Sequence, residues 1–533
     1  MRFCLLHLAL CLAALLVGCE PVAPAPAVKP TTGPLVRPAP VTGPINSPTV
    51  EPTLHQPVVQ QGADLPQPGE IWSAYYMQDK KVGYSHVQSR TVTENGKELL
   101  YTHGQSELTL NRETSTLTQR IDLKSWETPD GKLERFESRM TSGPGEIVAQ
   151  GKRVGEMMIV ATDTLGKRVT VPVPLPQKCG GYFAPDQSLE KSPLKPGEKR
   201  TVPCLIPVFN QPGETVLTAL EPEEVSIRGL EQKLLKVKSE IKIAGQTLTS
   251  YSWINDRGET VKTFDPSFKQ EAFRTTKQFA LAKNDLGRID LLAATTVPLK
   301  GKLPEERPLK AVTYLARLKD EKIDGQFASD EFQQTTAVDE HTARLQIHEL
   351  DRSSPVDKAL RGAEPTAAET SANSLIQSDD PAIVALANSI AAEETEPLAV
   401  SLALEKGTRA HITKRSYAQA FATAAEVVRS QEGDCTEHAV LLAALCRARK
   451  IPARVVLGLV FYPPQNGFAY HMWNEVWVGD RWVPLDATVA QGTVGADHIK
   501  LRHASLQGES AYAVMLPLLQ VVGRLELEVA RVE

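Results

Sequence analysis

The chain has 533 residues, more than a single hydrophobic core usually serves, so two or three domains are expected. Hydrophobic residues make up 41% of the sequence and charged residues 23%, which is the composition of a globular protein. The formal net charge of -5 excludes the strongly basic character that would indicate nucleic acid as a partner.

The amino terminus has the pattern of an export signal. Arg2 precedes an apolar run that is too short for an ordinary membrane-spanning helix. The run ends in Leu16-Val17-Gly18-Cys19, which resembles the lipobox of bacterial lipoproteins. This resemblance implies that residues 1–18 are a signal peptide and that Cys19 becomes the lipidated first residue of the mature chain. An ordinary cleaved secretory signal is the alternative, and both predict export.

Residues 19–68 are dominated by proline, valine, alanine and threonine and contain few large apolar side chains. Such a segment cannot bury a core, so we expect an extended, semi-rigid linker. A lipid anchor followed by this linker would hold the folded part of the protein away from a bacterial membrane. The predicted location is the cell envelope, on a membrane that faces the periplasm or the exterior.

Export also bears on the cysteines, because disulfides persist in oxidising compartments. Outside the signal and the lipobox, the cysteines are Cys179, Cys204, Cys435 and Cys446. Four cysteines allow three pairings. Eleven residues along one helix would separate Cys435 from Cys446 by roughly 16 Å, too far for a disulfide. We therefore expect the disulfide to join Cys179 and Cys204, which lie in a region rich in proline and glycine.

Residues 69–350 read as antiparallel β-strands, because apolar and polar residues alternate along most of the region. Turn signals such as Asn95-Gly96 and Asp130-Gly131 separate the strands. Two stretches, SWETPDGKLERF and SWINDRGETVKTF, share a Ser-Trp pair, a turn and a second strand that ends in Phe. They indicate two related β-layers or one long meander, or else a chance match of two hairpins. The region contains no cluster with catalytic or metal-binding spacing, so we expect a scaffold or a binding platform.

The rest of the chain has a different character. Residues 351–377 are polar and rich in alanine, which predicts a linker between domains. Residues 378–503 begin with segments whose apolar residues are three and four apart, as in helices, and continue with strands. Residues 504–533 form a C-terminal extension. The predicted fold class is α+β, with an N-terminal antiparallel β-rich region and a C-terminal α+β domain.

One cysteine of this last domain stands where a helix is expected to begin. Asp434-Cys435-Thr436-Glu437 has the form of a capping box, with Asp434 as the N-cap. Cys435 would then occupy the first turn, where the helix dipole and backbone N–H groups favour a thiolate and can hold an oxyanion. Cys446 lies deeper in the same helix among apolar residues and is expected to be inert.

A thiolate nucleophile also needs a base and a group that orients the base. Strands at Tyr470–Val478 and Arg481–Val489, joined by a two-residue turn, place His471 and Asp486 as diagonal neighbours on one face. This pairing depends on the register, since a slip of one residue would separate the two side chains. The order Cys435, His471, Asp486 is that of a catalytic triad.

The segment from about Ser378 to His503 resembles the transglutaminase-like superfamily, whose members have a permuted papain-like topology. GDCTEHAVLLAALCRARKIPARVV is similar to the nucleophile helix and the following strand of that family, and HMWNEVWVGDRWVPLDAT to its histidine and aspartate strands. The resemblance implies that Cys435 is the nucleophile, His471 the general base and Asp486 the group that orients the imidazole. No upstream side chain that would complete an oxyanion hole can be identified.

Several residues near these motifs have alternative interpretations. His438, one turn after Cys435, is a rival base or half of a zinc pair, but we expect it to support the site or pack in the core, and we predict no metal site. The aromatic residues of the hairpin either line a substrate groove or belong to the core: Trp473, Trp477 and Trp482.

The sequence supports two hypotheses on function. The first is an exported, membrane-anchored cysteine enzyme that acts on amide or peptide bonds through a thioester, with hydrolysis favoured over crosslinking. Its partner would be a protein or peptide substrate such as a cell-wall peptide, and no cofactor is expected. The second is an inactive transglutaminase-like fold that serves as a binding or assembly protein of the envelope.

Overall fold

The computed structural model describes residues 69–111, 116–142, 145–164, 167–227, 229–243, 246–283, 289, 292, 295–319, 322–415, 422–507 and 513–533. The predicted signal peptide, Cys19 and the proline-rich linker lie outside these residues. Among the helices that are described, none is long and apolar enough to cross a membrane.

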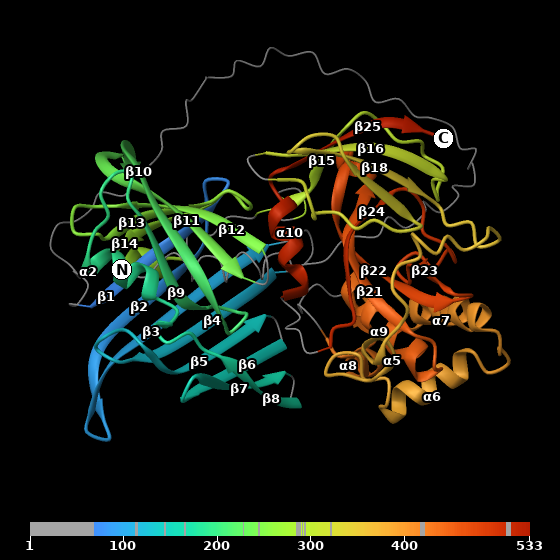
Figure 1. Cartoon of the computed structure of the whole chain (residues 1–533), viewed down its shortest axis with the longest axis horizontal. Coiled ribbons are helices and arrows are strands. Elements are labelled where there is room, and N and C mark those ends of the chain that lie inside the picture. Colours follow the sequence, from blue (N-terminus) through green and yellow to red (C-terminus); the bar gives the residue numbers. More distant parts are fainter. Residues whose placement is uncertain are drawn as a thin grey trace, which may run out of the picture.

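A large antiparallel sheet forms the first part of the molecule (Figure 1). Its 14 strands run in the order β8-β7-β6-β5-β4-β3-β2-β1-β14-β13-β12-β11-β10-β9. Two meanders are thus joined where β1 pairs with β14. The strands are β1 (Glu70–Met77), β2 (Lys80–Glu94), β3 (Lys97–Asn111), β4 (Thr116–Glu127), β5 (Leu133–Ser142), β6 (Gly145–Val154), β7 (Met157–Thr164), β8 (Lys167–Pro174), β9 (Lys199–Ile206), β10 (Gln211–Ile227), β11 (Leu230–Ile243), β12 (Gln246–Ile254), β13 (Thr260–Asp265) and β14 (Gln270–Thr275).

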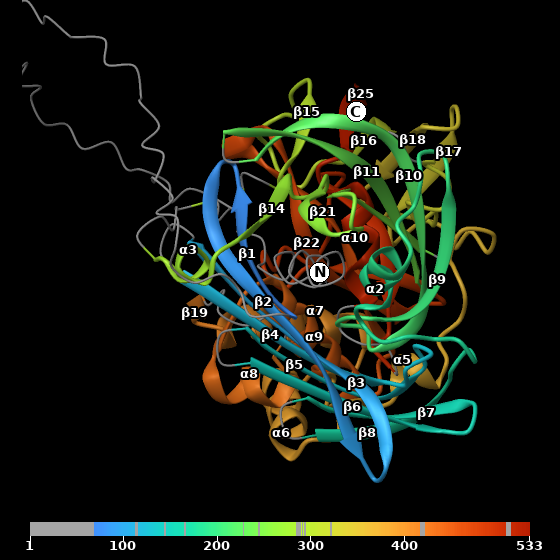
Figure 2. The same ribbon diagram turned by 90° about the vertical axis from the view of Figure 1, so that its left-hand side faces the viewer.

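Helix α2 (Ala184–Lys191) connects the two outermost strands, and the sheet curves around this connection (Figure 2). Tyr182 and Phe183, just before α2, are buried in the core. The Phe183 ring lies 2.5 Å from the position that a Cβ atom on Gly104 would take, so only glycine fits at that point of β3. A short helix, α3 (Lys277–Leu281), follows the sheet.

The two similar sequence stretches form equivalent hairpins, β4–β5 and β12–β13. In each hairpin the register shifts directly after the tryptophan, Trp126 in one and Trp253 in the other. A basic side chain covers each indole, Arg135 at 3.9 Å and Lys262 at 5.0 Å from the ring centroid. The sequence echo therefore corresponds to a repeated local structure.

The second part of the molecule is a mixed α/β region built on a nine-stranded sheet (Figure 1). Its main order is β17-β18-β16-β25-β15-β22-β21-β24, and β23 pairs with β22. The strands are β15 (Val297–Lys300), β16 (Ala311–Leu318), β17 (Gln333–Ala337), β18 (Thr342–His348), β21 (Ala453–Tyr462), β22 (Gly467–Val478), β23 (Arg481–Leu485), β24 (His498–Ala504) and β25 (Leu525–Val532). The fold class therefore agrees with the prediction.

Helix α9 (Cys435–Ala448) packs against β21 and β22 and is itself surrounded by other helices. The helices of this region are α5 (Ala367–Thr370), α6 (Pro381–Ile390), α7 (Pro397–His411), α8 (Ala424–Ser430), η1 (Pro463–Gln465), η2 (Ala513–Met515) and α10 (Leu516–Val521); a two-stranded parallel pair is formed by β19 (Lys414–Arg415) and β20 (Glu432–Gly433).

The division between the two sheets does not coincide with the predicted boundary at residue 350. Strands β15 to β18 belong to the second sheet, although they lie within residues 69–350. Residues 351–377 therefore connect two parts of the second region, and they are bound to it, since the Trp482 indole donates to the Ala363 carbonyl. The C-terminal extension is also part of this sheet, because β25 lies between β16 and β15.

The expected disulfide between Cys179 and Cys204 is not formed, because both residues are thiols. The two cysteines are close in space, since Gly180 pairs with Cys204 in an isolated parallel bridge. Their sulfur atoms nevertheless contact different groups. The Cys179 Sγ donates to the Gly180 carbonyl at 3.5 Å, and the Cys204 Sγ lies 3.4 Å from the Thr215 Oγ1.

A buried ion network holds the second sheet to the loop before β17. The Lys500 ammonium is fully buried and contacts the carboxylates of both Glu475 and Asp330. The Arg454 guanidinium lies 2.7 Å from the other oxygen of Glu475. Although burial alone would raise the pKa of Glu475, the charges of Lys500 and Arg454 outweigh it and hold that pKa at about 2.

We predict that Glu475→Ala strongly destabilises the protein, because it leaves two buried cations without their shared carboxylate. The expected loss in the free energy of unfolding is about 3–5 kcal/mol, measured by urea denaturation. Glu340→Ala is the matched control, since Glu340 pairs with Lys322 on the exposed surface and should unfold almost as the wild type does. Equal midpoints for the two variants would contradict the prediction.

Candidate functional site

Helix α9 begins at Cys435 because the residues around it form the predicted capping box. The Asp434 carboxylate accepts from the Thr436 N–H at 2.9 Å, and the Glu437 carboxylate accepts from the Asp434 N–H at 3.0 Å. Glu437 also accepts from the Ala422 N–H at 3.0 Å, which links the cap to the segment before α8. The structure therefore places Cys435 in the first helical turn, as predicted, and buries its side chain fully.

Cys446 occupies a different environment on the same helix. It is fully buried, and this burial raises the pKa of its thiol to about 12. A thiol with this pKa is protonated at physiological pH and does not act as a nucleophile. Cys446 thus has the packing role expected from the sequence.

The hairpin β22–β23 has the predicted register. Val478 pairs with Arg481, Asn474 pairs with Leu485, and no bulge occurs at Pro484. Continuing the same register puts Asp486, just beyond β23, diagonal to His471. The His471 Nε2 lies 2.7 Å from the Asp486 Oδ2, so the two side chains form a hydrogen bond.

The Asp486 carboxylate is fully buried but well supplied with donors. Its Oδ1 accepts from the Thr488 N–H at 2.8 Å and from the Thr488 hydroxyl at 2.6 Å, while Oδ2 faces His471 and His498. Burial alone would raise the pKa of Asp486. The charge of His471 and the hydrogen bonds from both histidines outweigh it and hold that pKa well below its ordinary value.

The orientation of the His471 ring leaves one nitrogen available. Its Nε2 is engaged with Asp486, and within the described part of the chain its buried Nδ1 has no hydrogen-bond partner. The Trp473 ring stacks beside it with 6.1 Å between centroids. A base that is held at one nitrogen and open at the other is suited to exchange a proton with a thiol.

His438, in the first turn of α9, is close to this pair. Its Nδ1 lies 2.6 Å from the Asp434 carbonyl, which accepts a hydrogen bond within the helix. Burial lowers the pKa of His438 to about 4, and the charges of Arg409 and His471 add to this effect. His438 is therefore neutral at physiological pH and supports the first turn of α9.

Two residues of the site were not identified from the sequence. His498, on β24, contacts the same Asp486 oxygen as His471 does, with its Nε2 3.3 Å from the Asp486 Oδ2. Glu405, on α7, accepts from the Asp486 N–H at 3.1 Å. Neither residue belongs to a recognisable motif, and both are brought to Asp486 by tertiary packing. For His498, the only local signal in the sequence is the adjacent Asp497.

The donor atoms of His471, Asp486 and His498 lie within 4.8 Å of one another, close enough for the three to be considered as a metal site. The 2.7 Å contact between His471 and Asp486 is a hydrogen-bond distance. Two ligands of one tetrahedral zinc ion would lie roughly 3.3 Å apart. The contact between His471 and Asp486 is therefore a hydrogen bond.

The three tryptophans of the hairpin mainly fill the core. Trp473 is 1% exposed and Trp482 is 6% exposed, and the Arg454 guanidinium covers the Trp482 ring at 3.8 Å. Trp477 is half-buried and packs edge-on against Trp482. Their burial favours the core interpretation over the groove interpretation.

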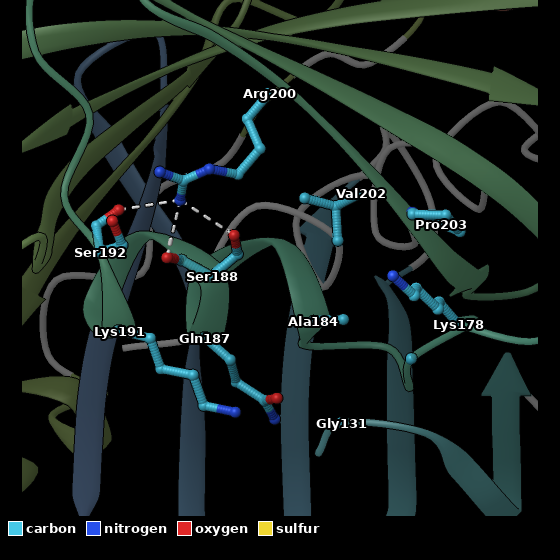
Figure 3. Close-up of a pocket in the computed structure, with 11 residues that line it drawn as sticks. Gly131, Lys178, Ala184, Gln187, Ser188, Lys191, Ser192, Arg200, Val202 and Pro203 are labelled. Carbon is cyan, nitrogen blue, oxygen red and sulfur yellow. Dashed lines mark hydrogen bonds between the residues drawn. The ribbon is translucent and has the colours of Figure 1, made fainter.

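A cavity of about 350 Å³ lies elsewhere, between α2 and the start of β9 (Figure 3). Lys178 and Lys191 line it, together with Arg200, whose guanidinium donates to the carbonyls of Ser188 and Ser192 at 2.8 Å each. Every residue that lines this cavity belongs to the first region. It is therefore separate from Cys435 and the hairpin.

Comparison with known families agrees with the site. The model of the transglutaminase-like superfamily matches residues 384–487. These residues form a transglutaminase-like domain. The domain contains all three residues of the predicted triad, whereas His498 lies just beyond the matched range. No curated protein matches the sequence of this chain.

Three solved structures are distantly similar. A candidate cysteine protease from Cytophaga hutchinsonii is 15% identical, with a TM-score of 0.26, over 41% of this chain and 82% of its own. A β-barrel-like protein of unknown function from Brucella abortus is 9% identical, with a TM-score of 0.30, over 39% and 94%. A candidate protease from Parabacteroides distasonis is 11% identical, with a TM-score of 0.18, over 67% and 64%. These similarities are too low to inform the function of the transglutaminase-like domain.

We expect Glu405 to make the stability of this domain depend on pH. Its side chain is fully buried, and burial together with the charge of Asp486 raises the pKa of Glu405 from 4.5 to about 8. Because this pKa is raised in the folded state, the stabilisation from its proton is fully present below pH 4.5 and is lost as the pH rises through 8.

We predict that Glu405→Gln, which mimics the protonated acid, removes this pH dependence. Between pH 5 and pH 8 the wild type should lose stability relative to the variant, at up to about 1.4 kcal/mol per pH unit. Denaturant unfolding of both proteins across this range measures the difference. Parallel stability curves would show that Glu405 is already ionised at pH 5.

Proposed function

We propose that the protein is an exported, membrane-anchored cysteine enzyme that acts on amide or peptide bonds through a thioester of Cys435. The observation that carries this proposal is the hydrogen bonding of the two ring nitrogens of His471. Its Nε2 is bound to Asp486, its Nδ1 has no hydrogen-bond partner among the described residues, and β22 packs against the helix that begins at Cys435. This arrangement occurs within a transglutaminase-like domain.

The proposed reaction has two steps. The Cys435 thiolate attacks the amide carbonyl, and His471 gives its proton to the departing amine, which leaves an acyl thioester on the sulfur. In the second step His471 takes a proton from water or from an acceptor amine, which attacks the thioester and releases the thiol. Asp486 keeps the imidazole oriented and compensates its positive charge in both steps.

The acceptor decides between hydrolysis and crosslinking. Water gives a free carboxylate, whereas an amine gives a new amide. We favour hydrolysis, because an exported lipoprotein encounters protein and peptide substrates, including cell-wall peptides, in the bacterial envelope. The location, the lipid anchor and the substrate class are parts of the proposal that derive from the sequence.

Burial of the triad supports a second candidate function. Cys435, His471 and Asp486 are each at most 1% exposed, and the cavity described above lies in the other region. An enzyme with this site must open to admit a peptide. If it does not open, the domain serves as an inactive fold in a binding or assembly protein of the envelope.

We predict that a small thiol reagent such as iodoacetamide modifies Cys435 at pH 6 far faster than it modifies Cys446. The two cysteines are equally buried on one helix, so Cys446 controls for access while lacking a partner base. In His471→Ala the rate at Cys435 should fall at least tenfold, as followed by peptide mass spectrometry. Equal rates at the two cysteines, unchanged in His471→Ala, would exclude the enzyme and favour the second function.

The same protein can be tested for its products. Wild type and Cys435→Ala are incubated with cell-wall peptides and envelope proteins, with or without a fluorescent primary amine. New amino termini in the wild-type sample alone indicate hydrolysis, and incorporation of the fluorescent amine indicates crosslinking.

The anchor is tested separately. We predict that Cys19→Ala moves the protein from the membrane fraction to the soluble fraction, because the variant lacks the residue that would carry lipid. Fractionation and intact-mass measurement of both forms check this. A wild-type protein without added lipid mass would instead support an ordinary cleaved signal.

A further inference from the structure

His498 lies between two carboxylates, one on each side of its ring. Its Nε2 is 3.3 Å from the Asp486 Oδ2, and its Nδ1 is 3.0 Å from the Asp497 Oδ1. The residue is 5% exposed, so water does not take the place of either contact. The proposed mechanism gives this histidine no role.

The other groups around His498 are fixed by three further elements. The His471 ring on β22 lies 5.6 Å away and the Trp473 ring 5.3 Å away, measured between centroids. The Arg307 Nε lies 3.0 Å from the Asp497 Oδ2 on the far side of that carboxylate. The Tyr314 hydroxyl on β16 donates to the carbonyl of Ala496, two residues before His498.

This geometry determines the protonation of His498. A neutral imidazole has one N–H, so one of its nitrogens would face a carboxylate oxygen with a lone pair. Only the imidazolium donates to both carboxylates. Burial alone would lower the pKa of His498, but the hydrogen bonds to Asp486 and Asp497 and their charges outweigh it and raise the pKa to about 9.

We propose that His498 is a positioning residue: a buried imidazolium that shares the Asp486 carboxylate with His471 and sets the pH range in which Cys435 is activated. This inference rests on the proposed function of Cys435 and His471. It adds a fourth member, outside the matched family range, to the three residues of the triad.

The charge balance gives the direction of the effect. Asp486 carries one negative charge and faces two histidines. The positive charge of His498 therefore compensates part of the negative charge that acts on His471. Removing a buried cation makes every nearby proton harder to lose, both from the Cys435 thiol and from the His471 imidazolium. The pH profile of Cys435 reactivity should therefore move to higher pH when His498 loses its charge.

The experiment measures the rate of Cys435 alkylation from pH 5 to pH 10 in wild type, His498→Gln and Asp497→Asn. Glutamine keeps a hydrogen-bond donor but carries no charge. In His498→Gln we expect the pH profile of Cys435 alkylation to move by about one pH unit toward alkaline pH. Asp497→Asn removes one of the two anions that stabilise the imidazolium. Its rates should match the wild type at pH 6 and approach those of His498→Gln at pH 8.

The matched control is His503→Gln, which replaces an exposed histidine on the same strand and should keep the wild-type profile. Thermal unfolding of each variant verifies folding, and a chelator in all samples removes any adventitious metal. An unshifted profile in folded His498→Gln, or an Asp497→Asn profile that matches wild type at pH 8, would overturn the proposal.

A second measurement separates this inference from the proposed function. Nitrogen-15 NMR of histidine rings follows the titration of His498 directly, with His498→Gln identifying its signals. If Cys435 shows no dependence on His471 at any pH, the proposed function fails, whatever the NMR shows. If Cys435 depends on His471 but His498 titrates near its ordinary pKa, only the present proposal fails.

Discussion

The hydrogen bond between Asp486 and His471 is the contact on which the arrangement of the site depends. It forms because a two-residue turn at Gly479-Asp480 sets the register of β22 and β23, and both turn residues have positive φ, 59° and 69°. One residue of slip would direct Asp486 to the other face of the sheet. The position of the turn thus determines which side chains face each other across the hairpin, even those more than five residues from the turn.

The groups around Asp486 compensate its buried negative charge. A fully buried carboxylate is costly unless donors and cations surround it, and here two histidines, one threonine and its backbone supply them. Burial and the negative charge of Asp486 raise the pKa of Glu405 to about 8, so Glu405 stays protonated at lower pH. In a second buried network, Glu475 on the strand of His471 contacts Lys500 on β24 and Arg454 on β21. The transglutaminase-like domain thus concentrates charge in its interior.

Local signals in the sequence were sufficient for the capping box at Asp434, the hairpin and the hydrogen bond from His471 to Asp486. They were not sufficient for His498 and Glu405, which come from a distant strand and helix and reach Asp486 through packing alone. The boundary at residue 350 failed for a related reason. Strands β15 to β18 alternate like those of the first sheet, and alternation does not say which sheet a strand joins. The thiols of Cys179 and Cys204 show that proximity alone does not make a disulfide.

The position of β25 has a consequence for biogenesis. It follows every other strand of the second sheet in the chain, yet it lies between β16 and β15, and β15 in turn pairs with β22, the strand of His471. During synthesis the sheet therefore keeps an open seam until Leu525–Val532 have emerged. Until then, β16 and its partner strands are not joined to β15, nor through β15 to the strand of His471.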